Sequence, residues 1–174
     1  MWLRKERPYV PPERSVLFVC MGNICRSPTA EAVFRATAER AGIAQHLLID
    51  SAGTGDWHVG EAPDKRAAAA AEKRGYDLSA LRGRQVTEAD FERFGWIFAM
   101  DQENLELLEA LRPPEYTGHL GLFLDLVPGS EVREVPDPYF GGPQGFERVL
   151  DMIERASEAL VAHLRDRLTF TASE

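Results

Sequence analysis

The chain has 174 residues, a length that suits one compact domain with a hydrophobic core. Its formal net charge of −8 argues against a broad nucleic-acid-binding surface, because such surfaces are usually basic. No stretch approaches the roughly 18 consecutive apolar residues of a membrane span, and the start of the chain has no apolar run typical of a secretory signal.

The first predicted elements are a short extension, a strand and a helix. Residues 1–14 are polar and contain proline, and we interpret them as an extension before the first strand. The apolar run at residues 16–19 predicts that strand. After a loop at residues 20–27, Pro28 occupies a favoured first position of a helix that ends at Gly42. One face of this helix carries apolar or small residues at helical spacing: Ala30, Val33, Phe34, Thr37 and Ala41.

The rest of the chain continues the alternation of strands and helices. Apolar runs predict three more buried strands, at residues 47–49, 96–100 and 119–123. Helical patterns predict three longer helices, at residues 63–74, 102–111 and 144–168. A capping box, Thr87-x-x-Asp90, predicts a further short helix. This order predicts a three-layer α/β fold, with a parallel sheet covered by helices on both faces. Ligands of such sheets bind beyond the carboxyl ends of the strands, where the strand order reverses.

The loop Cys-Met-Gly-Asn-Ile-Cys-Arg-Ser at residues 20–27 places a thiol at the end of a strand and an arginine at the beginning of a helix. A helix N-terminus offers unpaired backbone N–H groups, and successive loop amides form a concave nest for a phosphate. Anion binding alone does not require a cysteine at the base of the loop. The pattern therefore predicts chemistry on a bound phosphate, with the guanidinium of Arg26 holding two of its oxygens.

The thiol must be ionised before it can act as a nucleophile. A free cysteine has a pKa near 8.5. A drop of about 2.5 units corresponds to roughly 3.4 kcal/mol, whereas a helix terminus contributes about 0.3–1 kcal/mol and at best ~2. The remainder must come from loop amides, the hydroxyl of Ser27 and the field of Arg26. We expect Cys20 to attack phosphorus and form a phosphocysteine, which water then hydrolyses.

The leaving oxygen needs a proton, and Asp137 is the best candidate to supply it. This residue lies between Pro136 and Pro138 in a Pro/Gly-rich loop at residues 135–142. The two proline rings stiffen the backbone that presents the carboxyl group. A general acid of this kind contributes about 10²–10⁴-fold to the rate.

These motifs together resemble the low-molecular-weight protein tyrosine phosphatases. The resemblance rests on the loop at residues 20–27 and on Asp137-Pro-Tyr139 far downstream. Larger tyrosine phosphatases share Cys-x5-Arg but place the acid loop before the cysteine, so the order found here is specific. Four short matches agree with the family: Ser51-Ala-Gly, Asp56-Trp57, Arg84-Gln85 and Met100-Asp101. The resemblance covers residues 15–168 and leaves 169–174 as a tail.

The resemblance implies a role for each matching residue. Cys20 is expected to be the nucleophile, Arg26 the phosphate clamp, and Asp137 the acid and then the base. Support of the loop is expected from Asn23, Ser27 and Ser51. Phosphate binding is expected from the loop residues Met21, Gly22, Asn23, Ile24, Cys25 and Ser27. The aromatic walls around the substrate are expected to be Trp57, Tyr139 and Phe140. Ser27 is also expected to stabilise the thiolate when it leaves phosphorus.

The same resemblance implies a flavodoxin-like fold with four parallel strands, and catalysis without a metal or other cofactor. It also implies that Cys25 traps Cys20 in a reversible disulfide under oxidation. One departure is Leu81, where several relatives carry a histidine, so we expect a different polar network beneath the loop. The histidines of the chain show no metal-ligand spacing, and we expect solvent-exposed positions for all of them: His46, His58, His119 and His163.

The implied partner is a tyrosine-phosphorylated protein, such as a tyrosine kinase, with phosphate as the product and no nucleic-acid or membrane partner. Two cysteines within one loop are too close to staple a fold. They are typical of functional thiols in a reducing compartment, so we expect a cytoplasmic protein.

Three other functions stay open at this point. Phosphoarginine hydrolysis is one, although the subfamily with that preference carries a small polar residue where Ile24 stands. An arsenate reductase-like cycle is another, but it needs a further cysteine, and this chain has only Cys20 and Cys25. The non-enzymatic alternative is a phosphate-binding module or a redox switch that uses the same two thiols.

Overall fold

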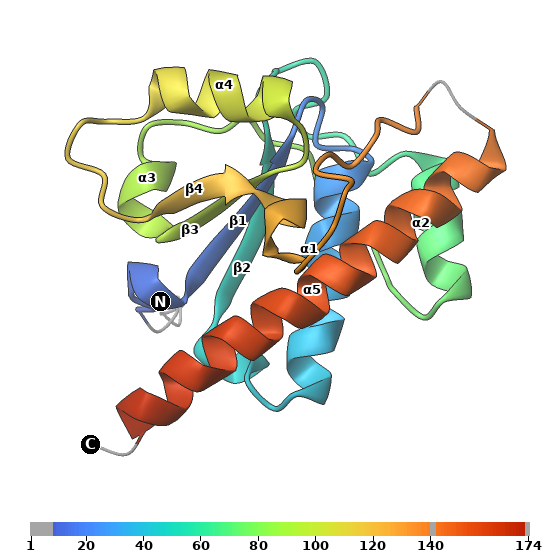
Figure 1. Ribbon diagram of the computed structural model, residues 1–174. Helices are drawn as coiled ribbons and strands as arrows, with labels where there is room; N and C mark the ends of the chain where they lie inside the picture. Colours follow the sequence, from blue (N-terminus) through green and yellow to red (C-terminus); the bar gives the residue numbers. More distant parts are fainter. Residues whose placement is uncertain (1–8, 140–141, 173–174) are drawn as a thin grey trace, which may run out of the picture.

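A sheet of four parallel strands forms the centre of the molecule. The computed structural model describes residues 9–139 and 142–172. The strands are β1 (Ser15–Cys20), β2 (Leu48–Gly53), β3 (Trp96–Ala99) and β4 (His119–Leu122). They pair in the order β2-β1-β3-β4, and every pair is parallel (Figure 1). The predicted parallel sheet is therefore confirmed.

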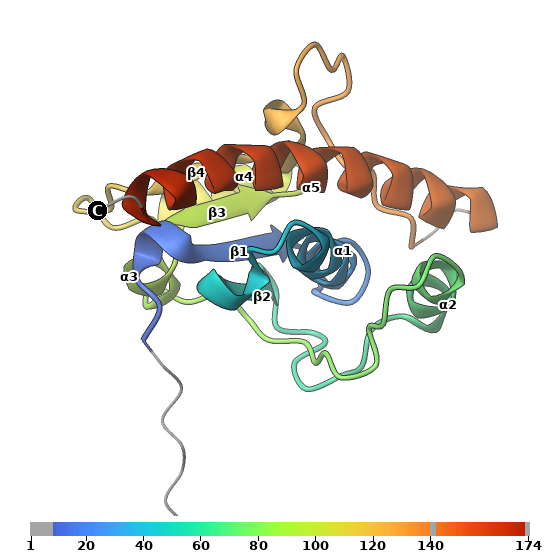
Figure 2. The same ribbon diagram turned by 90° about the horizontal axis from the view of Figure 1, so that it is seen from below.

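Helices cover both faces of this sheet. They are α1 (Arg26–Arg40), α2 (Lys65–Lys73), α3 (Asp90–Arg93), α4 (Gln102–Leu111) and α5 (Pro143–Ala172). The long helix α5 packs with α1 on one face, whereas α3 and α4 cover the other (Figures 1 and 2). In both views α2 lies beside the N-terminal half of α5. The three-layer α/β architecture agrees with the sequence-based expectation.

Strand β1 is buried on both faces, which explains its uninterrupted apolar sequence. Val16 and Phe18 belong to the core that β1 shares with α1 and α5, whereas Leu17 and Val19 belong to the core under α3 and α4. In the first of these cores, the ring of Phe18 packs edge-on against Phe34 of α1, with 5.6 Å between the ring centroids. The strand that carries the candidate nucleophile at its end is thus held rigidly from both sides.

The predicted elements all appear in the structure, although some ends differ. Helix α1 begins two residues earlier than predicted, at Arg26. The helix predicted at residues 63–74 is shorter, because the carboxylate of Asp64 accepts hydrogen bonds from two amides of its first turn and caps α2. Short 3₁₀ helices have no apolar periodicity and were not predicted; they are η1 (Pro12–Arg14), η2 (Ala44–His46) and η3 (Phe123–Leu126).

The end of the predicted N-terminal extension packs against the sheet. The carbonyl of Pro12 accepts a hydrogen bond from the amide of Gly95 (2.8 Å), just before β3. The indole N–H of Trp96 donates to the carbonyl of Glu13 (3.0 Å). These bonds tie η1 to the amino end of β3, while residues 1–8 lie outside the described part of the chain.

The strand order places the candidate loop at the crevice of the sheet. The chain passes from β1 to β2 on one side and then crosses to β3 on the other side of β1, so the order reverses at β1. Cys20 is the last residue of β1, and the loop that follows leads into α1. This arrangement puts the thiol, the loop amides and the N-terminus of α1 at the reversal point, as predicted.

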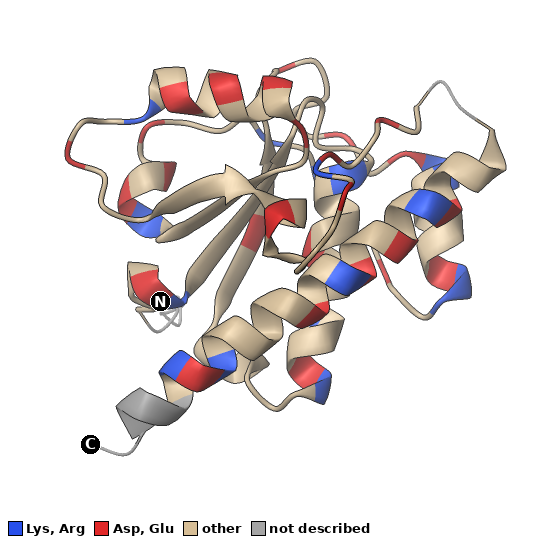
Figure 3. Ribbon diagram, viewed as in Figure 1, with Lys and Arg blue, Asp and Glu red and all other residues tan. Residues whose placement is uncertain are grey.

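Acidic residues occur on helices and loops around the sheet, interspersed with basic ones (Figure 3). Helix α4 carries glutamates and no lysine or arginine. By contrast, Arg26 lies at the buried N-terminus of α1, where only 3% of its surface is exposed. The described helices include none that is long and apolar enough to cross a bilayer.

Candidate active site

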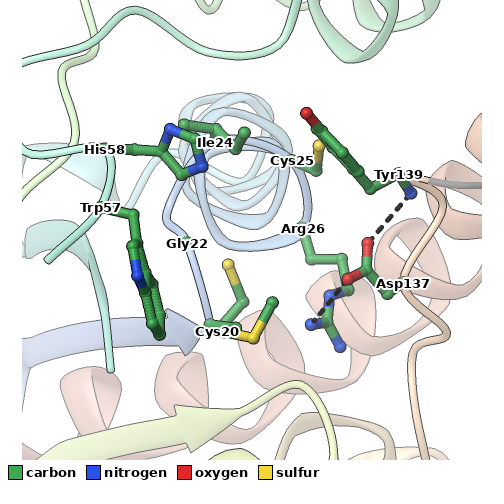
Figure 4. Close-up of a pocket in the computed structure, with 10 residues that line it drawn as sticks. Cys20, Gly22, Ile24, Cys25, Arg26, Trp57, His58, Asp137 and Tyr139 are labelled. Carbon is green, nitrogen blue, oxygen red and sulfur yellow. Dashed lines mark hydrogen bonds and ion pairs between the residues drawn. The ribbon is translucent and has the colours of Figure 1, made fainter. Parts of the chain in front are cut away.

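A cavity of about 290 Å³ opens at the carboxyl end of β1 (Figure 4). Its walls come from the loop after β1, the loop after β2 and the Pro-rich loop before α5. The lining residues are Cys20, Met21, Gly22, Ile24, Cys25, Arg26, Trp57, His58, Asp137 and Tyr139. The cavity therefore brings together residues that lie more than a hundred positions apart in the sequence.

Asn23 fixes the shape of the loop between β1 and α1. Its backbone has a φ of 56°, and no other non-glycine residue in the described part of the chain has a positive φ. Its side-chain amide donates hydrogen bonds to Ser27 Oγ (2.8 Å) and Ser51 Oγ (3.0 Å). Its side-chain oxygen accepts from the amide of Arg84 (3.0 Å). The left-handed conformation, which is costly for most residues, is thus held by three side-chain hydrogen bonds.

The hydrogen-bond network continues below the loop to a buried carboxylate. Ser51 donates to Glu31 Oε1 (2.8 Å), and Glu31 also accepts from Arg35 (3.1 Å). Burial raises the pKa of Glu31 above its ordinary value, against the hydrogen bonds from Ser51 and Arg35 that favour the charged form. Leu81, the departure noted in the sequence, packs against the apolar core. The expected difference from relatives in this network stays a prediction.

The sulfur of Cys20 lies at the base of the cavity and contacts two donors. The amide of Asn23 donates to Sγ (3.3 Å), and the hydroxyl of Ser27 lies 3.0 Å from it. Because Ser27 accepts a hydrogen bond from Asn23, its own proton is available for Sγ or for the carbonyl of Ala52. These are the groups that the sequence named as stabilisers of a thiolate.

The loop also depends on a close approach to β2. A Cβ on Gly53 would lie 2.8 Å from the carbonyl oxygen of Met21 and 3.2 Å from the amide nitrogen of Asn23. The amide of Gly55 donates to the same Met21 carbonyl (3.0 Å). Glycine at the end of β2 therefore lets the backbone of the loop after β1 lie directly against the strand.

Arg26 is anchored by groups from two other parts of the chain. Its Nη1 donates to Asp101 Oδ2 (2.6 Å) and to the carbonyl of Val135 (3.0 Å). Its Nη2 lies 3.9 Å from Asp137 Oδ2. Burial alone would lower the pKa of Arg26, but the sulfur of Cys20 and the carboxylates of Asp101 and Asp137 raise it above its ordinary value. The guanidinium is therefore a fixed positive charge beside the thiol.

Asp137 faces the same space from the opposite side. Its Oδ1 accepts from the amide of Tyr139 (3.0 Å), and its Oδ2 points toward Arg26 (Figure 4). The side chain is 34% exposed, so the carboxyl lies at the mouth of the cavity rather than at its base. Cys20, Arg26 and Asp137 are thus brought together around one cavity.

Aromatic side chains flank the mouth of the cavity. Trp57 and Tyr139 stand on opposite sides and are 68% and 39% exposed. Phe140, the third predicted wall residue, lies outside the described residues. His58 was expected at a solvent-exposed position, but its ring lines the cavity near Ile24 and Nδ1 lies 2.6 Å from Glu61 Oε2. The sequence pattern missed His58, although its position next to Trp57 was a usable signal.

Cys25 lies in the same cavity, but in a different chemical environment. It is 6% exposed, and the structure has it as a free thiol. Burial raises its pKa to about 12, with further contributions from the charges of Asp64, Cys20 and Asp137. A thiol with this pKa is neutral at physiological pH.

Three residues with clear positions in the site had no role assigned from the sequence. Asp101, quoted only as part of a short match, binds Arg26 and also caps α4 by accepting from the amide of Asn104 (2.8 Å). Its place directly after β3 was the signal that could have identified it. Glu31 lies on the buried face of α1, an unusual place for a carboxylate. Arg66 carries no motif, and its position next to Tyr139 follows only from the tertiary structure.

The sequence and the fold have counterparts in known proteins. A family model described as low molecular weight phosphotyrosine protein phosphatase matches residues 15–169. The low molecular weight protein-tyrosine-phosphatase YfkJ of Bacillus subtilis is 41% identical over 151 residues, which are 87% of this chain and 96% of that protein.

Solved structures agree with this similarity. The protein tyrosine phosphatase from Entamoeba histolytica, crystallised with Hepes in its active site, matches with a TM-score of 0.83 and 39% identity, over 87% of this chain and 97% of that chain. A Drosophila arginine phosphatase matches with a TM-score of 0.80 and 35% identity, over 86% of this chain and 96% of that chain.

Proposed function

The chain belongs to the low molecular weight phosphotyrosine protein phosphatase family, which makes it a protein-tyrosine phosphatase, and we propose that its hydrolysis runs through a phosphocysteine on Cys20. One observation carries the proposal. A thiol, a buried guanidinium and a carboxyl, those of Cys20, Arg26 and Asp137, line the same cavity at the end of β1.

Phosphate binding is the first step of the proposed cycle. Loop residues between Met21 and Arg26 line the cavity at the N-terminus of α1. We propose that the backbone amides of this loop and of the first turn of the helix bind the phosphate above Cys20 Sγ. Arg26 holds two phosphate oxygens as a planar fork. Its bonds to Asp101 and Val135 fix the guanidinium before substrate arrives, so little conformational entropy is lost on binding.

The chemical steps follow from the two sides of the cavity. The Cys20 thiolate attacks phosphorus from below, the S–P bond forms, and the bond from phosphorus to the phenolic oxygen breaks. Asp137, protonated at this stage, gives its proton to the leaving oxygen, so tyrosine departs as a neutral phenol. The Asp137 carboxylate then removes a proton from water, whose oxygen attacks phosphorus and releases phosphate and the thiolate.

Depth and aromatic walls support a preference for tyrosine esters. The phosphate must reach the base of the cavity near Cys20, while Trp57 and Tyr139 stand at its mouth, ready to contact a phenyl ring. A phosphoserine side chain is shorter and has no ring for these walls. We therefore expect the enzyme to reject it.

The test compares phosphotyrosine with phosphoserine peptides in the absence of added metal. We expect turnover of the phosphotyrosine peptide only, no turnover by Cys20→Ser, and a decrease of about 10²–10⁴-fold for phosphotyrosine with Asp137→Asn. Circular dichroism and thermal unfolding serve as controls for folding. A folded wild-type protein that binds phosphate but turns over no substrate would indicate a phosphate-binding module instead.

Phosphoarginine is the second candidate substrate, because a Drosophila arginine phosphatase shares this fold at 35% identity. Against it stands Ile24, an apolar residue that lines the cavity and suits a flat aromatic ring better than a guanidinium. Hydrolysis rates of phosphotyrosine and phosphoarginine in one assay distinguish the two. We expect Ile24→Thr to shift the ratio toward phosphoarginine.

A redox role for Cys25 also belongs to the proposal. Hydrogen peroxide would oxidise the Cys20 thiolate to a sulfenic acid, and the Cys25 thiol would condense with it, forming a disulfide and releasing water. In Cys25→Ser no disulfide can form, so excess peroxide oxidises the Cys20 sulfenic acid further to a sulfinic acid, which dithiothreitol does not reduce. We therefore expect dithiothreitol to restore activity to peroxide-treated wild type but not to Cys25→Ser.

We further propose that the protein partner is a tyrosine-phosphorylated protein such as a tyrosine kinase. The proposed location is the cytoplasm, where a reducing environment keeps the Cys20 thiol available for catalysis. The matched relatives support the phosphotyrosine part of this proposal and not a particular partner.

A further inference from the structure

The position of the Asp137 carboxyl depends on the backbone that follows it. Within the described part of the chain, the side chain of Asp137 accepts one hydrogen bond, from the amide of Tyr139 (3.0 Å). The distance to Arg26 Nη2 is 3.9 Å, too long for a hydrogen bond. Whatever holds the backbone at Tyr139 therefore also sets where the carboxyl points.

The beginning of this acid loop is fixed from inside the molecule. Val135 is buried, its amide donates to the carbonyl of Met100 (2.8 Å), and its carbonyl accepts from Arg26 (3.0 Å). Beyond this anchor Pro136, Asp137 and Tyr139 are exposed, whereas Pro138 between them is buried. The burial of Pro138 restricts the backbone next to Asp137, and a second anchor at Tyr139 itself would fix the amide that binds the carboxyl.

Arg66, in the first turn of α2, supplies that second anchor. Its Nη2 donates to the carbonyl of Tyr139 (2.8 Å). Its guanidinium carbon lies 5.3 Å from the centre of the Tyr139 ring and 5.0 Å from the centre of the Phe146 ring on α5. The cation thus contacts both the backbone and the ring of Tyr139, and the aromatic contact orients it further.

The guanidinium is itself held by the helix cap. Asp64 accepts from Arg66 Nε (3.3 Å) and Nη2 (3.2 Å) and also caps α2. The amide of Asp64 donates to the carbonyl of Ile24 in the phosphate loop (2.8 Å). A continuous connection therefore runs from the phosphate loop through Asp64 and Arg66 to the acid loop.

We propose that Arg66 is a positioning residue, which holds Tyr139 and thereby aims the Asp137 carboxyl at the leaving oxygen of the substrate. The inference rests on the proposed role of Asp137 as the general acid. Loss of Arg66 should then slow the hydrolysis of a substrate more, the more its leaving group needs a proton. Phenol is a poor leaving group and needs one, whereas p-nitrophenol leaves readily without it.

The experiment measures kcat/KM of Arg66→Met for phenyl phosphate and p-nitrophenyl phosphate. For each substrate, kcat/KM reports the steps from binding to cleavage of the ester bond, and the acid acts in that cleavage. We expect a loss of about tenfold for phenyl phosphate, equal to about 1.4 kcal/mol, and a much smaller loss for p-nitrophenyl phosphate. Arg66→Lys keeps a charge and a donor but not the planar fork, so it should recover part of the loss.

The matched control is Arg74→Met. Arg74 follows the last turn of α2 and binds Glu147, Asp151 and Glu154 on α5, so its removal loosens α2 without touching the acid loop. We expect its ratio of the two kcat/KM values to equal that of wild type. An equal selective loss in Arg74→Met would show general loosening of α2 and overturn the inference.

A double variant separates this inference from the proposed function. In Asp137→Asn, the further change Arg66→Met should have no additional selective effect on phenyl phosphate, because the acid is already absent. If Asp137→Asn shows the expected selective loss on phenyl phosphate but Arg66→Met keeps wild-type selectivity, the inference about Arg66 is overturned and the acid assignment stands. Wild-type selectivity in Asp137→Asn overturns the acid assignment, and the role of Arg66 with it.

Discussion

At the scale of single residues, the phosphate loop depends on one backbone conformation. Asn23 adopts a φ of 56°, which directs its own amide toward Cys20 Sγ (3.3 Å). Its side chain binds Ser27, Ser51 and the backbone at Arg84, so three separate segments hold this one residue. Asparagine tolerates the left-handed region better than most residues and also supplies both donors and an acceptor.

Replacement of Asn23 by alanine should disable the loop. Alanine pays about 1–2 kcal/mol in the left-handed region, and Ser27 and Ser51 lose a buried hydrogen-bond donor. We expect kcat/KM for p-nitrophenyl phosphate to fall by about 10–100-fold, with weaker inhibition by vanadate. In Asn23→Gly the backbone cost disappears, so its remaining loss measures the hydrogen bonds. Wild-type activity in both variants would contradict this account of the loop.

At the scale of elements, α1 and β2 share a buried carboxylate beneath the loop. Glu31 of α1 is 4% exposed and accepts from Ser51 of β2, which in turn accepts from Asn23. The contact joins the helix that follows the loop to the strand that lies against it. The raised pKa of Glu31, caused chiefly by burial, means that the folded protein favours the protonated form of this residue more than the unfolded chain does.

The pH dependence of stability follows from that direction. A carboxyl with a raised pKa in the folded state costs no stability at pH values below its unfolded pKa, near 4.3. As the pH rises above that value, the unfolded chain releases a proton that the folded state retains, so the stability of wild type falls. In Glu31→Gln this loss disappears, while the Gln side-chain oxygen can still accept from Ser51.

We therefore expect urea unfolding to show Glu31→Gln gaining stability relative to wild type between pH 4 and pH 7. The matched control is Glu39→Gln, an exposed glutamate of the same helix. A relative stability of Glu31→Gln that decreases over this range would contradict the assigned direction of the pKa.

At the scale of the whole molecule, the enzyme binds an anion although its net charge is −8. The positive potential at the site comes from a buried arginine, loop amides and a helix N-terminus rather than from a basic surface. The excess of acidic residues over basic ones, 28 against 20, repels negatively charged partners at distances beyond direct contact.

The charge of a phosphotyrosine peptide should therefore affect its kcat/KM, when peptides of equal length are compared. Peptides with lysine or arginine beside the phosphotyrosine should have higher kcat/KM than peptides with aspartate or glutamate there. The difference should be large where the screening length is about 30 Å, at 0.01 M salt, and much smaller at 0.15 M, where it is about 8 Å. A preference that does not change with salt would instead indicate direct contacts beside the cavity.

Much of the fold and the site could be predicted from local sequence patterns. The uninterrupted apolar run that became β1 and the helical spacing of small and apolar residues in α1 are local signals, and the loop between them contains the thiol and the arginine. Asp137 could be proposed as the acid because it lies between prolines in a recognisable motif, and the structure places it at the same cavity as Cys20 and Arg26. The ends of the helices were less predictable, since the cap of α2 depends on the side chain of Asp64.

What the sequence by itself determined was a set of reactive groups, because the residue types that stand at the end of a strand and the start of a helix are local information. The tertiary structure alone decided which distant groups complete the site. Asp101, Glu31 and Arg66 contact partners 20 to 75 positions away, at Arg26, Ser51 and Tyr139. No periodicity or spacing encodes such contacts, because strand order and the packing of helices on the sheet bring these side chains together only when the whole chain has folded.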